Sequence, residues 1–252
     1  MTAPDTVLNA FGLHQRTVLV TGASSGIGRQ IALSCAGAGA TVIVTGRNPE
    51  RLQALLDELG GSPHSIIVAD LNEEAQIAEL SKAIGKIDGL VHSAGIAALS
   101  PLRMASREHI ESQLATNLIA PMLLTRYLLA RQCIRNGGSI VFISSISAHI
   151  GVRGVSAYSA SKAAVEGMAR SLSIELAPRQ VRVNCLAPGF VRTPMLEAAS
   201  TTIGGLDTTI AKYPLGIGQP EDVANAALFF LAPASRWITG TTLVLDGGHT
   251  VE

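Results

Sequence analysis

Tyr158 and Lys162 stand four residues apart in the segment YSASK, at positions 158 to 162. Residues four apart on a helix share a face, so this phenol and this ammonium would be neighbours. A phenol with a pKa of about 10 is a poor proton donor or acceptor at neutral pH unless its anion is stabilised. A nearby positive charge favours the charged form of an acid, so we expect Lys162 to stabilise the Tyr158 anion. The pair therefore predicts general acid/base chemistry.

A glycine-rich segment, TGASSGIG at positions 21 to 28, follows a strand-like run and precedes a helical one. Glycine lets a backbone turn tightly and approach a ligand, and a helix N-terminus offers unpaired N–H groups to a phosphate. An ordinary strand-to-helix turn is the alternative. The residues expected to bind a dinucleotide here are Gly22, Ser24, Ser25, Gly26, Ile27 and Gly28.

The end of the second strand-like run, TVIVTGRNPERL, bears on which dinucleotide is bound. An acidic residue at that place would accept a hydrogen bond from the adenosine ribose and select NAD. Gly46 stands there instead, and Arg47 follows with a guanidinium that suits a 2′-phosphate. This pattern predicts NADP(H), with NAD(H) as the alternative and a solvated Arg47 as the alternative role for the arginine.

Seven near-continuously apolar runs, which begin near residues 17, 41, 65, 89, 139, 181 and 241, are typical of buried parallel strands. Helical spacing fills the intervals, as in PERLQALLDEL and AAVEGMARSLSIEL. The sequence therefore predicts an α/β fold: a Rossmann-like, doubly wound parallel sheet of about seven strands with helices on both faces. We expect a single domain over residues 1–252, with an N-terminal extension at 1–16 and a substrate lid at 190–220.

Composition excludes several classes of function. The 19 basic and 19 acidic residues cancel, which argues against nucleic-acid and anionic-membrane partners. The three cysteines match no zinc spacing, so no metal site is expected, and a reducing compartment fits best. Because neither a secretory signal nor a run of about 18 apolar residues is present, we expect a cytoplasmic protein.

The spacing TGxxxGxG together with YxxxK resembles the short-chain dehydrogenase/reductase family, in particular its 3-oxoacyl-acyl-carrier-protein reductases. The resemblance covers about residues 17 to 248, and further family motifs follow in order. They are Asp70-Leu71, HSAG at 92 to 95, Asn117, Ser145 and PGFVRT from Pro188. One departure is His92-Ser93, where the family more often has two asparagines. His92 either braces the central strands or is a satisfied core histidine.

The resemblance implies four catalytic residues: Asn117, Ser145, Tyr158 and Lys162. Ser145 would hydrogen-bond the substrate oxygen, Lys162 would also hold the nicotinamide ribose, and Asn117 would hold a water in a proton relay. The residues alone leave other roles open: Ser145 could cap a turn, and Asn117 could mark a helix kink or cap.

The family resemblance also implies further contacts with the dinucleotide. Asp70 would meet the adenine, and Val191 and Thr193 would lie near the carboxamide. The remaining contacts would be Leu71, Ser93, Ala94 and Gly95. The hydride would leave the pro-S face. Asp70 could instead cap the following helix, and Thr193, which precedes a proline, could be a helix N-cap.

The sequence thus predicts an NADP(H)-dependent oxidoreductase for a small carbonyl or secondary alcohol substrate. The family resemblance also implies a homotetramer. One alternative is a reductase of thioesters on acyl carrier protein, docked through Arg135 and Arg179; another is a non-catalytic dinucleotide sensor or scaffold. The substrate pocket is expected from residues 96–99, 147–155 and 195–217. Most residues in these ranges are small and apolar. Arg153 and His149 are exceptions, and the alternative for each is that it points to solvent.

Overall fold

One parallel sheet of seven strands forms the centre of the computed structural model, which describes residues 10–200, 208 and 210–251. The strand order is β3-β2-β1-β4-β5-β6-β7, and all pairs are parallel. The strands are β1 (Thr17–Thr21), β2 (Thr41–Gly46), β3 (Ser65–Val68), β4 (Ile87–His92), β5 (Ile134–Ile143), β6 (Arg182–Pro188) and β7 (Thr242–Leu245). The predicted fold class is confirmed.

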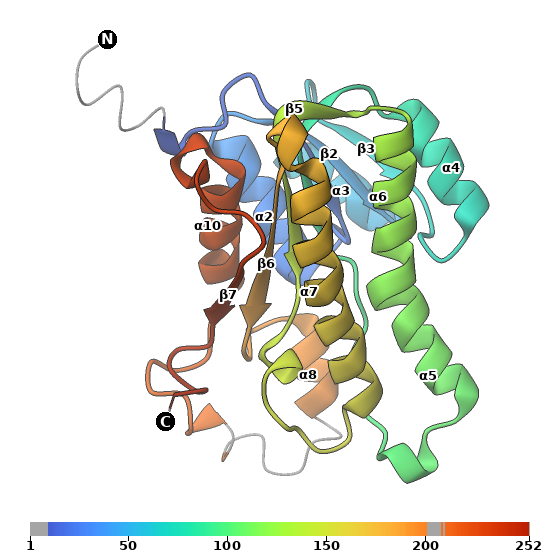
Figure 1. The fold of residues 1–252 in the computed structure, drawn as a ribbon, viewed down its shortest axis with the longest axis vertical. Coiled ribbons are helices and arrows are strands. Elements are labelled where there is room, and N and C mark those ends of the chain that lie inside the picture. Colours follow the sequence, from blue (N-terminus) through green and yellow to red (C-terminus); the bar gives the residue numbers. More distant parts are fainter. Residues whose placement is uncertain (1–9, 201–207, 209, 252) are drawn as a thin grey trace.

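Helices cover both faces of the sheet (Figure 1). One face carries α2 (Gly26–Gly37), α3 (Pro49–Glu58) and α10 (Pro220–Leu231). The other carries α4 (Glu74–Ala83), α6 (Ala120–Ala130) and α7 (Ser156–Leu176), with α5 (Arg107–Leu114) beside α7. The short helix α8 (Pro194–Ser200) lies in the predicted lid.

Alternation along the strands explains the two-sided burial. In β1, Val18 and Val20 belong to the core under α2 and α10, whereas Leu19 belongs to the core under α4 and α6. Successive side chains of a strand point to opposite faces, so a strand buried on both sides is apolar at most of its positions. This is why the apolar runs of the sequence located the strands.

Some boundaries differ from the predicted ones. β5 begins at Ile134, several residues before the apolar run, and its register with β4 shifts between Ile87 and Gly89. Residues 1–9 of the predicted N-terminal extension, and 201–207 and 209 of the predicted lid, lie outside the described residues. Within the described part of the chain, no helix is both long and apolar enough to cross a membrane.

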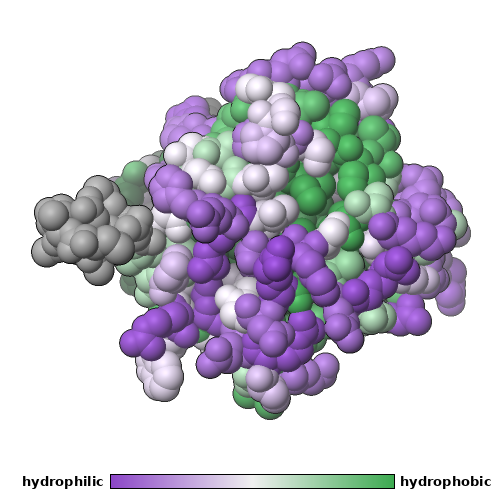
Figure 2. All heavy atoms as spheres, turned by 90° about the horizontal axis from the view of Figure 1, so that it is seen from above, coloured by the Kyte–Doolittle hydropathy of each residue, from purple (hydrophilic) through white to green (hydrophobic). Residues whose placement is uncertain are grey.

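The two ends of the sheet differ in the groups that surround them. Figure 2 views the molecule from the end where the central strands begin, and polar side chains surround an apolar area there. The strands finish at the opposite, lower end of Figure 1, where α8 and the start of α7 lie. In an open α/β sheet, ligands bind outside these carboxyl ends, at the point where the strand order reverses. Here that point lies between β1 and β4.

Candidate active site

A cavity of about 540 Å³ lies at the carboxyl ends of the strands. Every predicted site residue except Asn117 lines it. The glycine loop, the ends of β2 and β3, the loop after β4, the start of α7 and the loop after β6 all contribute to its wall. Residues spread over more than 170 positions of sequence therefore meet in one place. The described residues contain no group of three or more His, Cys, Asp or Glu that could hold a metal ion.

The loop between β1 and α2 needs glycine for two separate reasons. Gly22 has φ +64°, and a Cβ there would lie 2.6 Å from the Cα of Ala94. A Cβ on Gly28 would lie 2.5 Å from the carbonyl oxygen of Gly22. Real Cβ atoms do not approach backbone so closely. Gly22 therefore lets the loop after β1 pack against the loop after β4, and Gly28 lets the first turn of α2 pack against Gly22.

The N-terminus of α2 is open to a ligand. Ser25 is its N-cap but makes no side-chain capping hydrogen bond, and the first turn contains no acidic residue. The first N–H groups of a helix lack partners within the helix and carry the positive end of its dipole. A phosphate at this end of the cavity would satisfy them.

The adenosine end of the cavity contains two arginines. Arg47 follows β2 as predicted, and Arg51 from the first turn of α3 lines the cavity as well. Sequence reasoning missed Arg51, although its position four residues after Arg47 was a usable signal. A Cβ on Gly46 would lie 3.6 Å from the Ser24 Oγ, an ordinary contact distance. A side chain would therefore fit at position 46.

Asp70 lines the cavity and also supports its own loop. Its Oδ1 accepts a hydrogen bond from the backbone N–H of Asn72 at 3.0 Å. The helix after it begins only at Glu74. Asp70 is therefore a turn-forming residue next to the adenosine end. Its alternative role as a helix cap is wrong, because the N-cap of α4 is Glu73.

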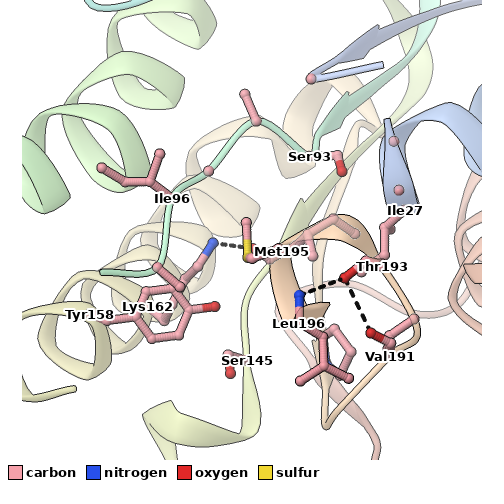
Figure 3. Close-up of a pocket in the computed structure, with 18 of the residues that line it drawn as sticks. Ile27, Ser93, Ile96, Ser145, Tyr158, Lys162, Val191, Thr193, Met195 and Leu196 are labelled. Carbon is pink, nitrogen blue, oxygen red and sulfur yellow. Dashed lines mark hydrogen bonds between the residues drawn. The ribbon is translucent and has the colours of Figure 1, made fainter. Parts of the chain in front are cut away.

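Helix α7 begins at Ser156, so Tyr158 and Lys162 lie one turn apart on it. The Lys162 Nζ donates a hydrogen bond to the backbone oxygen of Ile143 at 2.8 Å and lies 5.7 Å from the centre of the Tyr158 ring. Figure 3 shows the polar ends of Tyr158, Lys162 and Ser145 facing the same part of the cavity. The structure brings these three predicted residues together.

The electrostatics of this group differ from the expectation. Burial raises the pKa of Tyr158, and a hydrogen bond with Ser145 acts in the opposite direction. Burial also lowers the pKa of Lys162 to about 8, and Cys185 opposes that shift. A four-residue spacing indicates the attraction between the two charges but not the cost of removing each from water, which dominates in a buried site.

Ser145 and its neighbour Ser144 face different partners. The Ser145 Oγ accepts hydrogen bonds from the backbone N–H and the hydroxyl of Ser147, at 3.2 and 2.9 Å, so it does cap a turn. The Ser144 hydroxyl instead donates to the Glu166 Oε1 at 2.6 Å. Of the two serines, Ser145 is the one that meets Tyr158, which agrees with the prediction.

Asn117 lies in a π-helical turn, Ala115–Ile119, between α5 and α6. Its Oδ1 accepts from the Ile96 N–H at 2.9 Å, and its Nδ2 donates to the Ile96 oxygen and to the Ser161 Oγ. The side chain is thus occupied in joining the loop after β4 to α7. A π turn within an α-helix is frequent at functional sites.

The loop after β6 closes the site from the other side. The Thr193 hydroxyl donates to the Val191 oxygen at 3.2 Å and accepts from the Leu196 N–H at 3.4 Å (Figure 3). Thr193 therefore caps α8, the alternative role that its position before a proline suggested, while it also lines the cavity.

A stack of rings that sequence reasoning did not identify forms part of the wall. Phe190, Tyr213 and His249 stack in that order, with centroids 5.6 and 4.3 Å apart. The Tyr213 hydroxyl accepts a hydrogen bond from the Phe190 N–H at 3.0 Å. Tyr213 lies within the predicted lid range, but His249 follows the last strand and had no local signal.

His92 is buried at the end of β4. Its Nε2 lies 2.8 Å from the Thr125 Oγ1, whose hydroxyl donates to the Pro121 oxygen, so the ring donates through Nε2. Its ring stacks on Phe142 at 4.7 Å. Burial lowers the pKa of His92 to about 3, and the Nδ1 has no partner within the described residues. The ring both fills the core and links β4 to α6.

Comparisons with known proteins agree with this geometry. A family model described as enoyl-(acyl carrier protein) reductase matches residues 22–250. The 3-oxoacyl-(acyl-carrier-protein) reductase of Thermotoga maritima is 36% identical, over 95% of this chain and 99% of its own. Carbonyl reductase family member 4 of Xenopus laevis is 39% identical, over 91% and 95%.

Solved structures are similar over nearly the whole fold. A short-chain type dehydrogenase/reductase from Mycobacterium marinum has a TM-score of 0.88 and 33% identity, over 98% of this chain and 100% of its own. A putative NAD(P)-dependent gluconate 5-dehydrogenase from Beutenbergia cavernae, with bound NADP, has a TM-score of 0.87 and 37% identity, over 96% and 100%. The chain belongs to the short-chain dehydrogenase/reductase family and is an oxidoreductase that binds a nicotinamide dinucleotide.

Proposed function

We propose that the protein is an NADP(H)-dependent carbonyl reductase or alcohol dehydrogenase. The observation that carries the proposal is the meeting of Ser145, Tyr158 and Lys162 in one cavity with the glycine loop. The dinucleotide would supply or accept the hydride, and the protein would orient the substrate and manage the proton.

The residues divide the work as follows. Ser145 and Tyr158 hydrogen-bond the substrate oxygen, and Tyr158 transfers the proton. Because burial raises its pKa, Tyr158 carries its proton at neutral pH, which is the state that donates to a carbonyl oxygen. Lys162 holds the nicotinamide ribose and favours the phenolate, and a cationic nicotinamide would favour it further.

Asn117 acts mainly by holding the segments beside the catalytic group in place. Its three side-chain hydrogen bonds fix Ile96 and Ser161, which flank the catalytic group in the two neighbouring segments. We retain the proposal that Asn117 also holds a water for a proton relay toward Lys162. A Cβ on Gly95 would lie 3.1 Å from the Asn117 Oδ1 and 3.4 Å from the Lys162 Nζ, so both groups border the same glycine.

For the cofactor we propose NADP(H) over NAD(H). Arg47 and Arg51 both line the adenosine end, and Gly46, not an acidic residue, stands at the end of β2, where a carboxylate would accept a hydrogen bond from the ribose hydroxyl. Two guanidinium groups suit a 2′-phosphate, whereas a carboxylate at Gly46 would have repelled it. The bound NADP of the Beutenbergia cavernae structure supports the same choice.

A second candidate substrate is a 3-oxoacyl thioester on acyl carrier protein, since relatives 36% identical carry that name. Arg135 and Arg179, the expected docking residues, do not support it. Arg135, at the start of β5, lies 3.6 Å from Asp88 of β4. Arg179, after α7, donates a hydrogen bond to Asn136 of β5. They are at the end of the sheet opposite the cavity, and both are already paired.

Oxidation of NADPH with a panel of ketones, 3-oxoacyl thioesters, quinones and steroids tests the proposal. We expect turnover with at least one class, and none with Tyr158→Phe. Tight NADPH binding without turnover of any class would support a non-catalytic sensor instead.

A further inference from the structure

Among the described residues, no carboxylate lines the substrate end of the cavity. The ionisable side chains there, apart from Tyr158, Lys162 and the stacked Tyr213, are Arg153 and His249. The one carboxylate among the described lining residues is Asp70, at the adenosine end. Arg153 has no hydrogen bond or ion pair with any described residue. An unpaired guanidinium at the edge of a cavity is available to bind an anion.

Arg153 is carried by a loop that is anchored on both sides. Before it, the His149 Nε2 lies 3.0 Å from the Oε1 of Glu166, a nearly buried carboxylate on α7 that also accepts from Ser144. After it, the Gly154 oxygen accepts a hydrogen bond from the Ser100 N–H at 2.8 Å. His149 does not line the cavity, and its contact with Glu166 helps to hold the segment that presents Arg153.

Apolar residues line the same cavity as Arg153 and the catalytic group. Ile96, Ile150 and Val152 line it, and none of them offers a charge or a hydrogen-bonding side chain. A substrate that filled this space would therefore combine an apolar body with a polar group at each end, the carbonyl at Ser145 and Tyr158 and a second group near Arg153.

We propose that the substrate carries an anionic group, which Arg153 binds while the carbonyl meets Ser145 and Tyr158. The proposal rests on the proposed function, since it places the carbonyl at that site. The anion is either a carboxylate of the substrate itself or a phosphate of its thioester carrier. Both present oxygens that a guanidinium recognises with paired hydrogen bonds.

Two matched substrate pairs separate these sources. The first is 4-oxopentanoate and its methyl ester; the second is 3-oxobutyryl-coenzyme A and the corresponding N-acetylcysteamine thioester. We expect wild type to have a higher kcat/KM for the anionic member of at least one pair. Arg153→Gln should reduce that kcat/KM by about 5- to 50-fold, because Arg153 is partly solvated, and leave the neutral member nearly unchanged. Arg153→Lys should restore part of the loss.

Arg135→Gln is the matched control, because it removes one positive charge at the opposite end of the sheet. This variant should leave kcat/KM unchanged for both members of both pairs. If Arg153→Gln lowers kcat/KM for the anionic member of the first pair alone, the anion is a carboxylate. If it does so for the second pair alone, the anion is a phosphate. Equal kcat/KM for both members of both pairs, or an Arg153→Gln loss shared by neutral and anionic members, would overturn the proposal while leaving the proposed function intact.

Binding of unreactive analogues keeps the test independent of turnover. Calorimetry with protein loaded with NADP⁺ should show that pentanoate binds more tightly than methyl pentanoate, and that Arg153→Gln removes the difference. If this preference is seen without turnover of any ketone, the proposed function fails and the anion site stands. If neither binding nor turnover prefers the anion, the anion site fails.

Discussion

At the scale of single residues, the proton chemistry depends on one phenol. Tyr158→Phe deletes the hydroxyl and little volume, so the cavity should keep its shape. General acid/base groups contribute roughly 10²- to 10⁴-fold, and we expect kcat to fall at least that far while NADPH affinity stays nearly constant. Stopped-flow turnover and fluorescence titration of NADPH measure the two quantities. Residual activity within a few-fold of wild type would contradict the assignment.

His92 provides a residue-scale test of burial. Its pKa is about 3 in the folded protein, below the usual value of 6.5, because the charged ring would be buried. The unfolded chain therefore binds a proton that the folded protein does not, between about pH 6.5 and 3. Folding stability should fall as pH falls through this window, by at most about 1.4 kcal/mol per pH unit from this group.

His92→Asn removes the titration, so we expect the variant to lose less stability than wild type between pH 7 and pH 5. Urea unfolding at fixed protein concentration measures both. The variant should be the less stable protein at pH 7, because the stack on Phe142 is lost. If the free energy of unfolding falls equally in both proteins as the pH is lowered, His92 does not cause the loss of stability in acid.

At the scale of elements, the turn from β2 into α3 sets the choice of dinucleotide. Arg47→Ala removes a charge-assisted contact and should weaken NADPH binding by roughly 10- to 200-fold, with NADH unchanged. Arg51→Ala should also weaken NADPH binding. Adding Gly46→Asp to Arg47→Ala should invert the preference for NADPH over NADH, because the new carboxylate repels the 2′-phosphate. Titration of both cofactors against each variant measures this.

Arg107→Ala is the matched control. Arg107 lies on α5 and pairs with Glu111, and it lines neither the main cavity nor the smaller pocket beside the glycine loop. It should leave both affinities nearly constant. A wild type that already prefers NADH, or an Arg47→Ala protein weakened equally toward both, would show that Arg47 is only a solvated surface residue.

The elements were easier to predict than the contacts between them. Apolar runs located all seven strands. In the central strands this follows from burial on both faces, as in β1, where Val18, Leu19 and Val20 are all buried. The same reasoning could not find His249, which reaches the cavity only through tertiary stacking on Tyr213. It also misjudged the pKa of Tyr158, since burial is a property of the folded molecule and not of a four-residue spacing.

At the scale of the whole molecule, exposed apolar side chains suggest an assembly. Trp237 is 91% exposed and Ile174 73%, and Leu243 and Val244 of the edge strand β7 are more than a third exposed. Exposed apolar patches and unpaired edge strands commonly mark interfaces. We propose a homotetramer that pairs through α6, α7 and the C-terminal segment.

Sedimentation at micromolar concentration should show a tetramer, or at least a dimer. Trp237→Glu should dissociate it toward a smaller species, because burying an unpaired carboxylate in an interface is unfavourable. Glu175→Gln on α7 is a control, since it changes charge near Ile174 without adding one. A wild-type monomer would contradict the proposal.

The ring stack of Phe190, Tyr213 and His249 has a consequence for protein synthesis. A ribosome that has released residues up to about 193 has already supplied the glycine loop, both adenosine-end arginines and the catalytic tyrosine and lysine. The last ring arrives only after β7 has been translated. A nascent chain would therefore contain every proposed catalytic residue before its substrate wall exists, and formation of the complete pocket would be delayed until the end of translation.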